Sequence, residues 1–176
     1  IVTPAKRIAI QGVKGAFHEI AARKFFEGKI EWEMCDSFPA LFRSLNQEVA
    51  KYGVIAIENS VAGTILPNYA LLRNSDYAII GEVYLRIEHN LMALPGQDLS
   101  DISEVYTHPM ALKQCQSFLE SHPHLKPIEH ADTAGAAKWI REEGLYGKAA
   151  IASALAAELY SMEVLHPGIE DNKRNF

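Results

Sequence analysis

Short apolar runs alternate with amphipathic stretches along the first third of the chain. Residues 7–11 predict a buried strand, and the alternation of apolar and polar side chains over 30–35 predicts a second. Residues 53–57 predict a third strand that is wholly apolar. Between these strands, apolar side chains recur at helical spacing over 17–25 and 38–49. A strand that is apolar at every position is typical of a parallel sheet covered on both faces.

The same alternation continues to the C-terminal end. A helix is expected over residues 66–73, and the long β-branched stretch 77–93 predicts one or two strands that cross between lobes. Further strands are predicted at 104–107, 127–130, 148–152 and 162–165, with helices at 109–119, 133–141 and 154–160.

This order of elements predicts an α/β fold with mostly parallel sheets, because parallel strands need helical crossovers. The long central stretch favours two lobes with a cleft between them. We expect residues 1–84 and 164–176 to form the first lobe and residues 85–163 the second. Polar turns after parallel strands meet at one sheet edge, where ligands of such folds bind.

Composition excludes several classes of partner. The formal net charge is −5 and no lysine- or arginine-rich run occurs, so nucleic acid is not an expected partner. No apolar run reaches the roughly 18 residues that span a bilayer, and the start resembles no signal peptide, so we expect no membrane and a cytoplasmic location. Cys35 and Cys115 stand far apart and are expected to be structural thiols in a reducing compartment.

Three polar clusters follow predicted strands: residues 58–60, residues 107–109 with Gln114 in the next helix, and residues 132–133. Each is expected to precede a helix N-terminus, whose free N–H groups favour anions, so the three together would suit a dicarboxylate. The alternative is that these residues are ordinary turns and caps.

Other motifs are excluded by their spacing. The glycines Gly12 and Gly15 form neither a dinucleotide fingerprint nor a P-loop. The seven histidines lack the spacing of a zinc site, and Ser60 and Ser153 lack the Gly-x-Ser-x-Gly elbow of hydrolases. The residues alone thus indicate an α/β protein with an anion-binding cleft, and they leave the reaction open.

Five segments in the same order resemble motifs of the prephenate dehydratase family. They span nearly the whole chain. They are Gly12–Ala22 (G-x-x-G-x-F-[SH]-x-x-A-A), Ile57–Gly63 (I-E-N-S-x-x-G), Leu85–Leu91 (L-x-I-x-H-x-L), His108–Cys115 (H-P-Q-A-L-x-Q-C) and Ala149–Tyr160 (A-A-I-A-S followed by A-A-x-L-Y). In the fourth segment, Met110 stands where glutamine is common in the family.

The resemblance implies a fold like that of periplasmic binding proteins, a homodimer or higher homo-oligomer, and no metal or organic cofactor. It implies conversion of prephenate to phenylpyruvate, with loss of carbon dioxide and water. The residues it places at the cleft as catalytic are Glu58, Asn59, Ser60, His89 and Gln114, and as substrate-binding Gly63, Thr133 and Asn175. Asn59, Ser60 and Thr133 would donate to substrate oxygens, whereas His89 and Gln114 either touch the substrate or orient neighbouring groups.

Two departures from the family pattern stand near the C-terminal end. The family continues after Asn175-Phe176 with Thr-Arg-Phe, whose threonine is the favoured proton donor, and then with an ACT domain that senses phenylalanine; neither is in this sequence. We therefore expect a chain without its acid, and regulation by phenylalanine only where an ACT domain exists. Alternatives are an arogenate dehydratase, a small-anion binding protein of the same fold, and an interaction module without chemistry.

Overall fold

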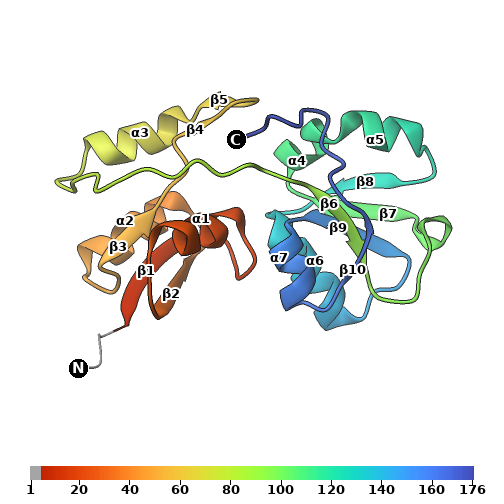
Figure 1. Cartoon of the computed structure of the whole chain (residues 1–176), viewed down its shortest axis with the longest axis horizontal. Coiled ribbons are helices and arrows are strands. Elements are labelled where there is room, and N and C mark those ends of the chain that lie inside the picture. The colour runs from red at the N-terminus through yellow and green to blue at the C-terminus, as the bar shows by residue number, and fades with distance from the viewer. Residues whose placement is uncertain (1–4) are drawn as a thin grey trace. The chain divides into compact units, whose positions relative to one another are not determined.

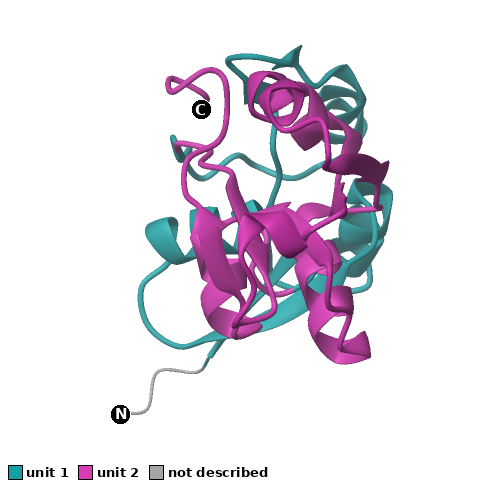
Figure 2. Cartoon of the chain, turned by 90° about the vertical axis from the view of Figure 1, so that its right-hand side faces the viewer, with its two compact units in different colours: residues 1–13, 17–85, 176 teal, residues 14–16, 86–175 magenta. Residues whose placement is uncertain are grey.

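The computed structural model describes residues 5–176, so the first four residues of the predicted first lobe lie outside the described part. The chain forms two compact units, coloured separately in Figure 2. Unit 1 comprises the chain up to Val13, residues 17–85 and Phe176. Unit 2 comprises residues 14–16 and 86–175. No helix among the described residues is both long enough and apolar enough to cross a bilayer.

Unit 1 is built on a three-stranded parallel sheet in the order β2-β1-β3. Its elements run in the sequence β1 (Lys6–Gln11), α1 (Phe17–Phe25), β2 (Ile30–Cys35), α2 (Phe38–Asn46) and β3 (Tyr52–Val54), as labelled in Figure 1. The predicted strands and helices of this region are confirmed, except that the second helix ends at Asn46 instead of residue 49 and the third strand ends at Val54 instead of residue 57.

Side chains along β1 point alternately to the two faces of this sheet, so β1 contributes core residues on both sides. Ile8 and Ile10 pack with Ala22 of α1 on one side, and Ala9 packs with Leu41 and Phe42 of α2 on the other. The Ser37 hydroxyl begins α2 by accepting a hydrogen bond from Ala40 N at 3.3 Å. Because helices cover both faces, the strand is apolar throughout its centre.

Unit 2 contains a five-stranded mixed sheet in the order β10-β6-β9-β7-β8. Strands β9 (Lys148–Ala152), β7 (Glu104–Thr107) and β8 (Lys126–Glu129) are parallel, whereas β6 (Asn90–Ala93) and β10 (Glu163–His166) are antiparallel to their neighbours. An α/β fold in which parallel pairing predominates over antiparallel pairing is thereby confirmed.

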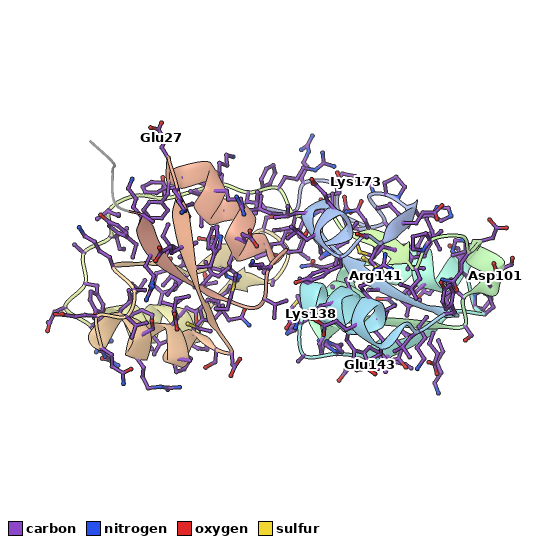
Figure 3. The ribbon with its side chains drawn as sticks, turned by 90° about the horizontal axis from the view of Figure 1, so that it is seen from below. Glu27, Asp101, Lys138, Arg141, Glu143 and Lys173 are labelled. Carbon is purple, nitrogen blue, oxygen red and sulfur yellow. The ribbon has the colours of Figure 1, made fainter. Side chains whose placement is uncertain are left out.

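Helix α6 (Thr133–Glu143) packs on this sheet through a buried stripe that ends in Ile140. Arg141, labelled in Figure 3, donates to the carbonyl oxygens of Tyr160 and Ser161 at the end of α7 (Ala154–Leu159). A cation suits that position because helix C-termini carry partial negative charge. The other face of the sheet buries Leu91, Val105 and Cys115.

Both cysteines are free and buried, as the sequence predicted. Burial, with the neighbouring charges of Asp171 and Glu170, raises the pKa of Cys115 to about 12. The thiol is therefore protonated at neutral pH and serves as a small core side chain.

Three predicted elements differ in the structure. Only Asn90–Ala93 of the long stretch 77–93 is a strand; residues 76–89 form no regular element, and Ile79 and Ile80 are 72% and 62% exposed. The helix predicted at 109–119 is divided into α4 (Pro109–Gln114) and α5 (Gln116–Ser121), because Cys115 leaves helical geometry at φ −118°. The third difference is that residues 58–60 lie in an antiparallel hairpin and do not open a helix.

The predicted lobe boundaries also need correction. Residues 164–175 were assigned to the first lobe, but β10 pairs with β6 and Ile169 lies in the core of unit 2. Residues 14–16 belong to unit 2 as well, since Ser153 Oγ donates to Gly15 O at 2.6 Å and Tyr160 Oη to Lys14 O at 2.6 Å. The periodicity of side chains along the sequence indicates local structure and does not reveal such long-range contacts.

Burial of the His18 ring is expected to make the stability of unit 1 depend on pH. Its ring packs edge-on against Phe38 at 5.3 Å, its Nε2 atom is buried with no hydrogen-bond partner among residues 5–176, and burial lowers its pKa from 6.5 to about 4. Between those pH values the unfolded chain binds a proton that the folded chain does not. The stabilising contribution of neutral His18 to the free energy of unfolding is therefore fully present above pH 6.5. It falls by up to about 3 kcal/mol as the pH drops to 4.

Urea unfolding of the variant His18→Gln at pH 7, 5.5 and 4.5 checks this expectation. In His18→Gln the free energy of unfolding should fall much less between pH 6.5 and 4 than in the parent protein. In the exposed control His124→Gln it should fall as it does in the parent protein. An unchanged decline in His18→Gln would assign the acid sensitivity to other groups.

Candidate active site

Three predicted site residues meet inside unit 2. His89 precedes β6, Gln114 ends α4, and Asn175 lies near the C-terminal end of the chain. His89 Nε2 lies 2.7 Å from Gln114 Oε1, and Asn175 Nδ2 donates to the same oxygen at 3.0 Å. All three are buried, at 3%, 7% and 1% exposure. We call these three residues the amide network.

The amide network fixes the orientation of Gln114. An amide oxygen only accepts hydrogen bonds, so the His89 ring carries its proton on Nε2 and donates it to Gln114. With Oε1 occupied by two donors, Gln114 Nε2 is held on the opposite side of its amide group. No group among residues 5–176 accepts a hydrogen bond from that Nε2 atom. The two hydrogen bonds to Oε1 therefore hold the Gln114 amide group, and with it the Nε2 donor, in one orientation.

Burial keeps His89 in its neutral form. Desolvation lowers the pKa of the imidazole, while the hydrogen bond with Gln114 and the charge of Glu170 act in the opposite direction. A neutral ring whose one proton is already donated to Gln114 is poorly placed to act as an acid. The geometry thus favours the second of the two roles predicted for His89, the orientation of a neighbouring group.

Glu170 supports the amide network and was not among the predicted site residues. Its side chain is 1% exposed, and Oε2 accepts a hydrogen bond from His89 N at 2.9 Å. Oε1 lies 3.8 Å from Arg86 Nη2 and 3.7 Å from Lys173 Nζ; Lys173 is labelled in Figure 3. A buried acid needs such partners. Its position in Ile169-Glu170-Asp171, which resembles the family pattern I-x-D, was the available sequence signal.

The segment after Gly168 brings Asn175 to Gln114. Ile169 N donates to His89 O at 2.8 Å, and Asp171 N donates to Gln114 O at 2.7 Å. The Asp171 carboxylate accepts from Gln116 N and Ser117 N, both at 3.1 Å, at the start of α5. Because α5 begins at Gln116, these two backbone amides have no partner within the helix and donate to the Asp171 carboxylate instead.

Residues 58–60 form a hairpin and not the start of a helix, which corrects the sequence expectation. Strands β4 (Glu58–Asn59) and β5 (Gly63–Thr64) pair antiparallel, and Gly63 adopts the positive φ of 79° that the turn requires. Helix α3 (Leu66–Arg73) begins later without a side-chain cap. Glu58 is exposed, while Asn59 and Ser60 hydrogen-bond to the backbone of Phe176.

Thr133 is the first residue of α6 and is partly exposed. The preceding Asp132 carboxylate accepts from Gly135 N, so Asp132 is the helix cap, which the sequence left open between Asp132 and Thr133. Thr133 is not part of the amide network, and its predicted contact with substrate stays a prediction. Among residues 5–176 no group of three His, Cys, Asp or Glu side chains is arranged to hold a metal ion.

Comparison with known proteins identifies the family. A sequence model described as prephenate dehydratase matches residues 8–176. The chain belongs to the prephenate dehydratase family. The resemblance recognised in the five sequence motifs is thereby confirmed, and the amide network is a feature of a prephenate dehydratase domain.

Relatives and solved structures agree with this membership. Arogenate dehydratase 5, chloroplastic, from Arabidopsis thaliana is 41% identical over 96% of this chain and 40% of its own length. A bifunctional N-acyl-homoserine lactone acylase/prephenate dehydratase from Komagataeibacter europaeus is 37% identical over 96% of this chain and 59% of its own.

The crystal structure of a prephenate dehydratase from Arthrobacter aurescens in complex with L-Phe superimposes with a TM-score of 0.84. The two sequences are 27% identical, and the matched region covers 96% of this chain and 57% of the Arthrobacter chain. The prephenate dehydratase fold is thus shared across the described chain. The chain spans 40% of the length of the Arabidopsis relative, so the activity of the whole protein is a matter for proposal.

Proposed function

We propose that the protein is a prephenate dehydratase, a carbon–oxygen lyase that converts prephenate to phenylpyruvate with loss of carbon dioxide and water. The observation that supports this most is the buried amide network in a chain of this family, because it holds Gln114 Nε2 as a fixed donor. Aromatic amino-acid biosynthesis is the corresponding process.

The reaction demands little from the protein beyond orientation and a proton. The ring carboxylate leaves as carbon dioxide, its bonding electrons form the aromatic ring, and the ring hydroxyl departs as water after it gains a proton. Gln114 would hold a substrate oxygen, with His89 and Asn175 fixing Gln114. Preorganised donors of this kind lower the barrier because they need no reorganisation during the reaction.

Arogenate is the alternative substrate, and the 41% identity to proteins named arogenate dehydratases supports it. Loss of carbon dioxide and water from arogenate yields phenylalanine in place of phenylpyruvate. Incubation with each substrate at neutral pH, followed by chromatographic measurement of both products, decides between them. We expect the higher kcat/KM for prephenate; a higher value for arogenate would reassign the substrate, and tight binding without product would indicate an anion-binding protein.

A homo-oligomeric state and a cytoplasmic location belong to the same proposal. A homodimer is expected from the family resemblance, and light scattering of the purified protein tests it. The Arabidopsis relatives are named chloroplastic, so fractionation of the source cells is the appropriate test of location.

A further inference from the structure

The hairpin of unit 1 binds the backbone of Phe176 through three hydrogen bonds. Ser60 N and Asn59 Nδ2 both donate to Phe176 O at 3.0 Å, and Phe176 N donates to Ser60 Oγ at 2.9 Å. Both polar groups of the Phe176 backbone are therefore held by two adjacent residues. The Phe176 side chain is 48% exposed, so the hairpin recognises main chain and not the aromatic ring.

Asn59 is preorganised for this contact. Its Oδ1 atom accepts from Val61 N at 3.0 Å and from Ala62 N at 2.9 Å, which fixes the amide across the turn. With Oδ1 directed to the turn, Nδ2 is directed to Phe176 O. Both ends of the Asn59 side chain thus have backbone partners, which is typical of a residue that orders the chain.

The neighbouring residue is fixed as well. Asn175 O accepts from Ile87 N at 2.7 Å, and its side chain donates to Gln114. Because Asn175 O and Phe176 N belong to one planar peptide unit, the hydrogen bond that fixes Phe176 N also fixes the plane that contains Asn175 O and Asn175 Cα. The hydrogen bonds of Asn59 and Ser60 therefore bear on the residue that orients Gln114.

We propose that Asn59 and Ser60 are positioning residues that fix the backbone of Phe176, and through Asn175 the amide network, in place of donating to substrate oxygens. Their effect on turnover rests on the proposed dehydratase function, whereas their hold on Phe176 does not. This assignment replaces the substrate contacts that the sequence led us to expect for these two residues.

Two substitutions test the proposal in the protein as its gene encodes it. Ser60→Ala removes the acceptor of Phe176 N, and Asn59→Asp keeps the acceptor of the turn while removing the donor to Phe176 O. We expect each to lower kcat about tenfold with KM within about twofold, because the barrier rises while ground-state binding is kept. The Phe176 amide in Ser60→Ala should exchange with deuterium about tenfold faster.

Ser75→Ala is the matched control, since the Ser75 hydroxyl donates to Leu72 O at 2.8 Å in the same unit, and it should change none of these values. Unchanged exchange at Phe176 in Ser60→Ala would overturn the proposal, whether or not the protein is active. A raised KM with unchanged kcat would also overturn it, since that result indicates substrate contact. Faster exchange in a protein without dehydratase activity would retain the hold on Phe176 and reject the proposed function.

Discussion

Replacing Gln114 with alanine is expected to lower kcat/KM for the preferred substrate at least about a hundredfold, equal to about 2.7 kcal/mol in the barrier. The variant loses the fixed donor at Nε2 and leaves two buried donors, His89 Nε2 and Asn175 Nδ2, without their acceptor. Stability should also fall by about 1–3 kcal/mol, since two buried donors each lose a hydrogen bond. Steady-state kinetics and urea unfolding measure the two effects.

The variant Gln114→Glu distinguishes the effect of the N–H donor from the effect of the hydrogen bonds within the amide network. A carboxylate oxygen still accepts from His89 and Asn175, but the N–H donor is lost and the added charge raises the pKa of His89. Turnover should fall as in the alanine variant while more of the stability is kept. The control Gln116→Ala removes an exposed hydrogen bond to Glu120 on the adjacent helix and should leave turnover within about twofold. A Gln114→Ala variant with near-normal kinetics would refute the role of this amide.

Replacing Gly15 with alanine should cost about 3 kcal/mol or more of folding free energy. Gly15 has a φ of +90°, and an added Cβ would lie 2.8 Å from Ala156 Cα in the backbone of α7. Neither partner can move away easily, because Ser153 at the start of that helix also binds Gly15 O. Chemical denaturation of the variant measures the loss.

Gly28→Ala is the matched control for the backbone term. Its φ is +88°, and an added Cβ would meet nothing within 4 Å, so only the strain of a left-handed conformation remains, about 1 kcal/mol. Equal losses in the two variants would show that the contact of Gly15 with α7 adds nothing to stability.

Elements with strong local signals were predictable from sequence. Residues 30–35 and 148–152 form strands with the predicted bounds, and α6 begins at residue 133, as predicted. The stretch 77–93 was not predictable from its β-branched residues, because a strand also needs a neighbour with which to pair. The hairpin at residues 58–60 was missed because a polar cluster after an apolar run resembles a helix start.

The site was predictable only in part, and chiefly through the family resemblance. The family resemblance placed His89, Gln114 and Asn175 at one cleft, and the structure joins them through one amide oxygen. The resemblance could not indicate that Glu170 holds His89 N or that Ser60 holds Phe176 N, since these contacts link residues 81 and 116 positions apart. Polarity at a position in sequence does not reveal whether its partner is substrate or main chain.

The most direct test of the central claim is the stoichiometry of a single reaction. Prephenate is supplied at neutral pH to the purified protein as its gene encodes it, and the released carbon dioxide and phenylpyruvate are measured together. We expect one molecule of each per prephenate consumed, at a rate far above the background in buffer. Consumption at the background rate, or binding of prephenate without either product, would contradict it.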